Sequence, residues 1–137
     1  MKYWIICGLL LCISCGTGSK PVTAAASAFI LKVNEKQKTG ELLITLKEIK
    51  ESRCPMNARC IRAGEAVAVL NVVIGNKSER NIQLCAGPDC DRRGLSEVYT
   101  LSAENQKYLF RLDSITPDPT RTLEKTETKV YFTVDQK

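Results

Sequence analysis

Apolar side chains recur at every second position through most of this chain, and no stretch keeps the period of about 3.6 residues that marks a helix. The run 66–74 is the extreme case, because its even and its odd positions are both apolar in the main. A strand that is apolar on both faces belongs in the middle of a sheet. We therefore expect a chain of β-strands, with apolar or alternating runs at 29–33, 42–46, 66–74, 82–84, 98–101, 108–112 and 130–134.

About seven short strands separated by turn-forming residues are typical of an antiparallel β-sandwich, and a small β-barrel is the alternative. Ile49 falls out of phase with the run before it, which predicts a bulge or a bend. The stretch 116–120 contains Pro117 and Pro119, so we expect a loop before the last strand. Residues 28–137 amount to one domain that is long enough to bury a modest core.

Residues 1–14 have the layout of an export signal. Lys2 supplies a positive start, and 4–13 is an apolar run too short to span a bilayer. Ser14 precedes Cys15, and a small residue before a cysteine resembles a lipobox, in which that cysteine is lipidated and becomes the new N-terminus. We expect a signal peptide at 1–14, a lipidated Cys15 and a small, polar tether over 15–27. An ordinary secreted protein cleaved nearby is the alternative.

A cysteine-closed loop joins the runs 42–46 and 66–74. Pro55 fixes its own φ and biases Cys54 toward extended geometry, which places a corner after the preceding strand. The stretch 51–66 carries Ser-Arg-Cys-Pro, then Cys-Ile and Ala-Gly, and it resembles a motif of small lipoproteins from Bacteroidota-type bacteria. The C-terminal half of those proteins is similar to a later arrangement in this chain, Tyr108, Leu112, Pro117, Pro119, Tyr131 and Val134. The resemblance implies a location and a fold, without an activity.

The residues after Cys15 bear on which membrane face the protein occupies. No acidic run follows this cysteine, whereas an acidic run at that place resembles a surface-export tag in such bacteria. We therefore expect a lipid anchor in the outer membrane, on the periplasmic face rather than on the cell surface.

The seven cysteines divide by position. Cys7 and Cys12 leave with the signal peptide and Cys15 carries lipid, so four remain in a compartment where thiols are oxidised. Four cysteines allow three pairings. Closeness in sequence favours two short rings, Cys54 with Cys60 and Cys85 with Cys90. A four-thiolate zinc site is the rival, but the spacing misses the usual zinc knuckle, so we expect no metal and no cofactor.

The absence of histidine argues against most hydrolytic chemistry, because it removes the Ser-His-Asp and Cys-His nucleophile systems. No spacing of the early glutamates indicates a pair placed across a cleft. These are Glu41, Glu48, Glu51 and Glu65. Lys2 leaves with the leader, which lowers the formal net charge from +5 to +4, too little and too diffuse to indicate nucleic-acid binding. We expect a non-enzymatic monomer.

Five arginines surround the two cysteine loops, namely Arg53, Arg59, Arg62, Arg92 and Arg93. If both loops lie at the same end of the sandwich, these guanidinium groups form a surface suited to carboxylate, phosphate or sulfated-sugar ligands. The alternative, which we favour, is that they are solvated and pair with nearby acids. The candidate acids are Glu51, Glu65, Asp89 and Asp91. Arg53 is the exception, because it belongs to the stretch that carries the resemblance, and we expect it to hold the loop by hydrogen bonds to carbonyls.

Two functional classes remain. The first is a lipid-anchored binding or envelope-interaction module, whose loops on a rigid sandwich meet an envelope protein or a glycan. The second is an inhibitor or immunity-type protein that blocks a target enzyme with its disulfide-stiffened loop. We place the binding module first.

Lipidation at Cys15 is directly testable. The intact mass of the native protein should show an acylated N-terminus at this residue. The substitution Cys15→Ser should release the protein from membranes, because acyl chains provide the anchor. Mass spectrometry and membrane fractionation check both points. A Cys15→Ser form that still sediments with membranes would contradict the assignment.

Overall fold

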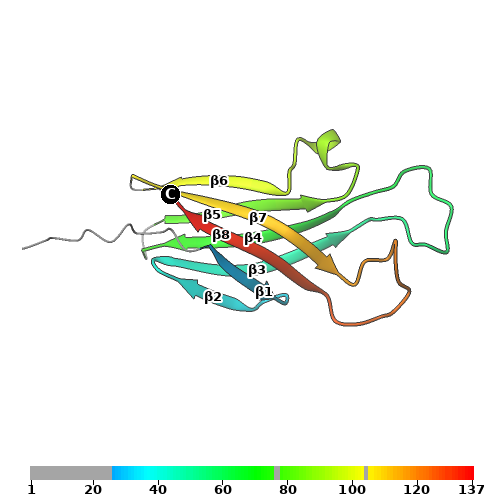
Figure 1. Cartoon of the computed structure of the whole chain (residues 1–137), viewed down its shortest axis with the longest axis horizontal. Coiled ribbons are helices and arrows are strands. Elements are labelled where there is room, and N and C mark those ends of the chain that lie inside the picture. Colours follow the sequence, from blue (N-terminus) through cyan, green and yellow to red (C-terminus); the bar gives the residue numbers. More distant parts are fainter. Residues whose placement is uncertain (1–25, 76–77, 104) are drawn as a thin grey trace, which may run out of the picture.

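The computed structural model describes residues 26–75, 78–103 and 105–137 and is built almost wholly from strands (Figure 1). The strands are β1 (Ser27–Leu31), β2 (Lys36–Thr39), β3 (Leu42–Glu51), β4 (Ala66–Ile74), β5 (Ser78–Ala86), β6 (Val98–Ala103), β7 (Gln106–Thr116) and β8 (Lys129–Gln136). A short 3-10 helix, η1 (Cys90–Arg93), lies between β5 and β6. The expected leader, Cys15 and nearly all of the tether lie outside the described residues. Among the described residues, no helix is long and apolar enough to cross a membrane.

Two four-stranded sheets form the molecule, in the orders β1-β8-β7-β6 and β2-β3-β4-β5. Every pair of neighbouring strands is antiparallel. This arrangement confirms the predicted antiparallel β-sandwich, and the small-barrel alternative is wrong because the strands form two separate sheets. β4 lies between β3 and β5, in the interior position that its two apolar faces predict.

The sandwich has one strand more than the sequence predicts, because Lys36–Thr39 pairs with β3 as the edge strand β2. The side chains of β2 are polar or charged and mostly exposed, so no apolar alternation marks this strand. A short edge strand rich in lysine discourages pairing with a further strand. β1 ends at Leu31, earlier than expected, and Val33 lies in the turn that leads to β2.

The core is one cluster of alternating apolar side chains between the sheets. Phe110 of β7, Phe132 of β8 and Leu70 of β4 are fully buried within it. The ring of Phe29 lies 5.5 Å from that of Phe132, centroid to centroid, so β1 is packed onto the same cluster. Burial of each large apolar side chain contributes about 1.5–3 kcal/mol. This core is a rigid support for the connections at its ends.

Register shifts interrupt the pairing at two places, between Leu46 and Glu48 of β3 and between Leu112 and Ser114 of β7. The first confirms the irregularity predicted near Ile49, which packs partly buried against the core. A bulge bends a strand and increases its local twist. Both shifts lie in the half of the strand that leads to the long connections described next.

Three long connections leave the same end of the sandwich, on the right in Figure 1. They are 52–65 between β3 and β4, 87–97 between β5 and β6, and 117–128 between β7 and β8. We call this set the loop end. β1 starts at the opposite end, where Ser27 pairs with Val134 of β8. The described chain therefore begins far from the loop end.

Candidate functional site

The β3–β4 connection is a ribbon rather than an open loop. Beyond the strands, the amide of Ser52 donates to the carbonyl of Glu65 over 2.9 Å, and the amide of Cys54 donates to the carbonyl of Ala63 over 2.8 Å. The disulfide between Cys54 and Cys60 then closes the top of the ribbon. We call residues 54–62 the tip loop. It is held by hydrogen bonds at its base and by a covalent bond above them.

Two glycines let three backbone segments approach more closely than side chains permit. Gly64 has a φ of +77°, and a Cβ at this position would lie 1.9 Å from the carbonyl oxygen of Ser52. Gly87 has a φ of +128°, and a Cβ there would lie 2.7 Å from the carbonyl oxygen of Gly64. Gly64 provides the expected turn and lets the two sides of the ribbon approach each other, whereas Gly87 brings the 87–97 connection into direct backbone contact with the ribbon.

Arg53 is the buried cation at the base of the ribbon, with 7% of its side chain exposed. Its Nε donates to Oε1 of Glu51 over 2.8 Å, and its Nη2 lies 2.5 Å from Oε2 of the same carboxylate. The same Nη2 also donates to the carbonyls of Ile115 and Pro117, each over 3.2 Å. The hydrogen bond from Arg53 to Glu51 and the negative charge of the Glu51 carboxylate raise the pKa of Arg53. Arg53 therefore ties the ribbon to the end of β7 by hydrogen bonds to carbonyls, as predicted from the sequence.

Asp118, in the 117–128 connection, is a further partner of the Arg53 guanidinium. Its Oδ1 lies 3.4 Å from Nη1 of Arg53. Burial opposes ionisation of this carboxyl, but hydrogen bonds from Thr120 and the charges of Arg53 and Arg121 outweigh it and lower the pKa. Because the pKa of Asp118 is lower in the folded protein, its ionised carboxylate stabilises the fold fully at pH values above the ordinary aspartate pKa. This stabilisation is lost as the pH falls through the lowered pKa. The contact therefore persists at neutral pH.

The structure joins Cys54 to Cys60 and Cys85 to Cys90, the two local pairs that the sequence favours. A four-thiolate zinc site is excluded, because each of these sulfur atoms is bonded to another sulfur. Cys85 and Cys90 are buried against Val67 on the outer face of β4, with Leu95 beside them. The second disulfide thus fixes η1 on the sheet, and it explains why β4 is apolar on its outer face at this end.

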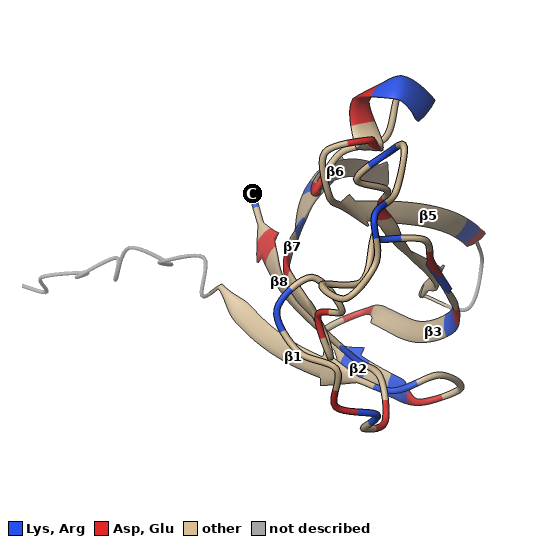
Figure 2. Cartoon of the chain, turned by 90° about the vertical axis from the view of Figure 1, so that its right-hand side faces the viewer, with Lys and Arg blue, Asp and Glu red and all other residues tan. Residues whose placement is uncertain are grey.

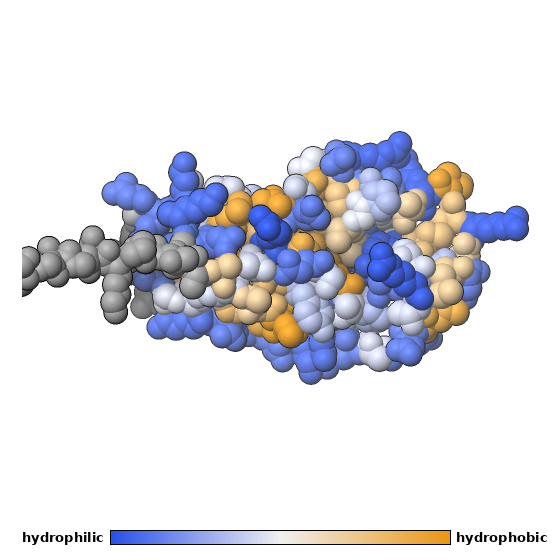
Figure 3. Space-filling model, viewed as in Figure 1, coloured by the Kyte–Doolittle hydropathy of each residue, from blue (hydrophilic) through white to orange (hydrophobic). Residues whose placement is uncertain are grey.

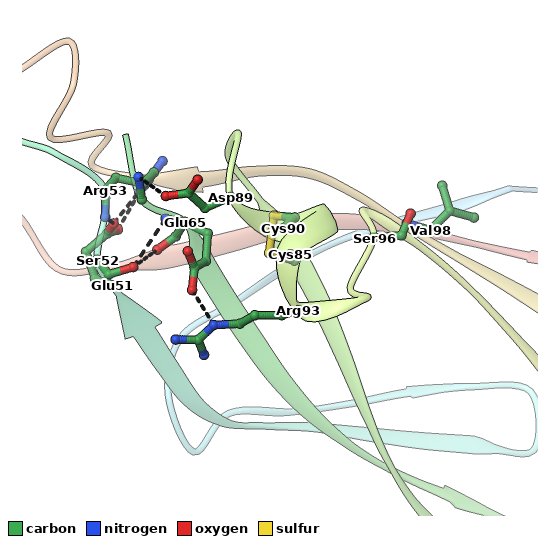
Figure 4. Close-up of a disulfide and its surroundings, with 11 residues drawn as sticks. Glu51, Ser52, Arg53, Glu65, Cys85, Asp89, Cys90, Arg93, Ser96 and Val98 are labelled. Carbon is green, nitrogen blue, oxygen red and sulfur yellow. Dashed lines mark hydrogen bonds and ion pairs between the residues drawn. A yellow bond between two sulfur atoms is a disulfide. The ribbon is translucent and has the colours of Figure 1, made fainter. Parts of the chain in front are cut away.

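Two contacts join the ribbon to the η1 segment (Figure 4). The amide of Gly64 donates to Oδ2 of Asp89 over 2.9 Å. Nε of Arg93 lies 2.7 Å from Oε1 of Glu65, whose side chain is only 8% exposed. The ribbon and η1 are therefore held at a fixed separation.

The space between the ribbon and η1 is a groove of about 760 Å³, which we call the inter-loop groove. The ribbon side contributes Ser52, Cys60, Ile61, Arg62, Gly64 and Glu65, and the η1 side contributes Asp89, Arg92 and Arg93. Figure 2 looks onto the loop end and shows basic and acidic residues interspersed along its connections. The two disulfide loops thus lie at the same end of the sandwich, and their walls face a common groove.

The five arginines do not form a single surface. Arg62, Arg92 and Arg93 line the inter-loop groove, whereas Arg53 lines a separate cavity of about 280 Å³ beside Asp118. Arg59 lies exposed in the tip loop and lines neither space. The expectation that Arg53 belongs to the candidate binding loop is corrected, because its guanidinium is buried and bound to partners within the protein.

The expected pairing with acids is correct for part of this set. Arg53 pairs with Glu51, and Arg93 pairs with Glu65. Asp89 instead accepts a hydrogen bond from a backbone amide. In the part of the chain that the structure describes, Arg59, Arg62 and Arg92 form no ion pair. These three charges remain available to a ligand.

Exposed apolar side chains on the tip loop were not anticipated as functional. Ile61 is fully exposed, and Met56 is 58% exposed. Figure 3 shows apolar surface at the loop end, on the right of the view. The available signal is a methionine directly after Pro55 and an isoleucine between Cys60 and Arg62, in a tip loop too short to bury them. Asp118 was also missed, because nothing local marks an acid that pairs with a residue far away in the sequence.

No protein-family model, curated protein or solved structure matches this chain. Across the residues that the structure describes, no group of three or more histidine, cysteine, aspartate or glutamate side chains could hold a metal ion. The function is therefore inferred from the geometry and chemistry of the loop end.

The close approach at Gly64 predicts a specific sensitivity to a single methyl group. Gly64→Ala should destabilise the protein by about 3 kcal/mol, because the Cβ meets the Ser52 carbonyl and the backbone also has a positive φ. Gly40→Ala is the matched control, since Gly40 has a φ of +55° and nothing within 4 Å of the added Cβ. It should cost only about 1 kcal/mol. Urea unfolding measures both, and equal losses would contradict the proposed backbone contact.

Proposed function

We propose that this protein is a non-enzymatic, lipid-anchored binding module of the cell envelope, related to the small lipoproteins that its motif resembles. Cys15 anchors it in the outer membrane, on the periplasmic face, and the loop end binds an envelope protein or a glycan. The observation that carries the proposal is that the loop end and the start of β1 lie at opposite ends of the sandwich (Figure 1). A tether attached before β1 leaves the loop end free to face away from the membrane.

The preorganised loop end supports binding. Loops that are already ordered lose little conformational entropy when a partner binds, which leaves more of the contact energy for affinity. Here the ribbon is fixed by the Cys54–Cys60 disulfide, by Arg53 and by Gly64. A rigid scaffold that presents loops is also a common arrangement for binding sites.

The charged groups in the groove support a non-enzymatic role. The chain has no histidine to act as a general base near neutral pH. Glu65 pairs with Arg93, and Asp89 accepts the amide of Gly64, so both groove carboxylates serve structural contacts. A carboxylate held in this way is poorly suited to exchange protons with a substrate.

An inhibitor or immunity-type role is the second candidate, and the tip loop favours it. Met56 lies exposed within the ring that the Cys54–Cys60 disulfide closes, and Ile61 lies exposed directly after Cys60. A rigid loop with exposed apolar side chains has the form of a wedge that fills an enzyme cleft. Ile61 is then the anchor residue, and Arg59 and Arg62 contact acidic groups at the rim of the cleft.

Photo-crosslinking in living cells distinguishes these roles. A diazirine amino acid at position 61 reports on the tip loop, and the same amino acid at position 30 is the control, because Ile30 is 58% exposed on β1. We expect adducts from position 61 and few from position 30. Adducts with envelope glycans or structural envelope proteins support the binding module. A single enzyme that the purified protein inhibits stoichiometrically supports the second candidate. Equal labelling from both positions would contradict a role for the loop end.

A further inference from the structure

The inter-loop groove has walls that the protein itself holds in place. The Gly64 amide contacts Asp89 across it, and Arg93 reaches over to Glu65. Its volume of about 760 Å³ falls within the range of small-ligand sites. The groove is therefore a preformed space and does not need a partner to open it.

Two guanidinium groups that form no ion pair with the described residues line this space from different segments, together with the carboxylate of Asp89. Arg62 lies on the ribbon and Arg92 lies on η1, and neither forms an ion pair with any residue that the structure describes. Arg93 is neutralised by Glu65. A guanidinium binds carboxylate or sulfate groups through parallel hydrogen bonds, so the free pair favours a ligand with at least two anionic groups.

The backbone of the groove argues against an extended peptide as that ligand. A peptide that adds to a sheet edge needs unpaired backbone groups. Here the Ser52 amide donates to the Glu65 carbonyl, the Glu65 amide donates to Oγ of Ser52, and the Gly64 amide donates to Asp89. These three amides are therefore not available to an added strand, and the side chains offer two guanidinium groups for anions and Ile61 as an apolar contact.

We propose that the inter-loop groove binds an acidic oligosaccharide, with Arg62 and Arg92 each holding a carboxylate or sulfate group of the sugar chain and Ile61 packing against a sugar ring. This ligand presents anionic groups at regular intervals and does not require a free strand edge. The inference rests on the proposed function, since it names the ligand class of a binding module.

The test uses the full-length protein in a non-ionic detergent and three probes of similar length. Two are acidic oligosaccharides, a galacturonate hexamer and a heparin-derived hexasaccharide, and the third is hexaglutamate. Titration calorimetry compares the wild type with the double variant R62Q/R92Q. The control is R80Q/R111Q, which removes the same net charge from exposed arginines on β5 and β7.

We expect at least one oligosaccharide to bind the wild type more tightly than hexaglutamate does. Its affinity should fall about tenfold or more in R62Q/R92Q, because each lost guanidinium removes charge-assisted hydrogen bonds. The control R80Q/R111Q should lose no more than about twofold, the part due to overall charge. On binding, the methyl NMR signals of Ile61 should shift and those of Ile30 should not. This last readout needs no variant and is independent of any folding defect.

Three results would overturn the assignment. Equal losses in both double variants would mean that binding follows net charge alone. Tighter binding of hexaglutamate would assign the groove to acidic protein segments. Failure of both oligosaccharides to bind the wild type would remove the sugar site. Crosslinking from position 61 is scored separately, so a failed sugar assignment leaves the broader binding role to be judged on that result.

Discussion

The loop end depends on one buried charge, the guanidinium of Arg53. A cation removed from water is tolerated only where anions and carbonyl oxygens replace its hydration. Glu51, Asp118 and the carbonyls of Ile115 and Pro117 provide those partners. Because they come from opposite sheets and from the β7–β8 connection, satisfying this one group requires the connections to be in place together.

Glycines and disulfides also fix the positions of the connections at the loop end. Gly64 permits the close approach of the two sides of the ribbon, and Gly87 permits the backbone contact that brings the η1 segment against the ribbon. The Cys54–Cys60 bridge closes a short ring, so in the chain-entropy model its own contribution is about 2 kcal/mol. Its main effect is on the shape of the tip loop, while the core between the sheets carries most of the stability. A stable shape at this end is what the binding role requires.

Alternation of apolar residues was sufficient to predict the sandwich and seven of its strands, because the core selects every second side chain. It could not reveal β2, whose residues are polar because an edge strand covers little of the core. The disulfide pairs could be inferred because each joins cysteines close in sequence. Which arginines share a groove could not be inferred, since it depends on how the connections fold back. Asp118 was hidden for the same reason, as its contact with Arg53 joins two distant loops.

Amide hydrogen exchange in Arg53→Met tests most directly whether this charge organises the loop end. Methionine keeps much of the apolar stem but removes every polar contact, and we expect a loss of about 2 kcal/mol, given that both carboxylates are partly exposed. Arg59→Gln is the control, since Arg59 is exposed and forms no ion pair with any residue that the structure describes. The account predicts faster exchange at both 52–65 and 115–121 in Arg53→Met, with protection of β4 retained and little change in the control. Faster exchange confined to the immediate neighbours of residue 53, or equal changes in both variants, would contradict it.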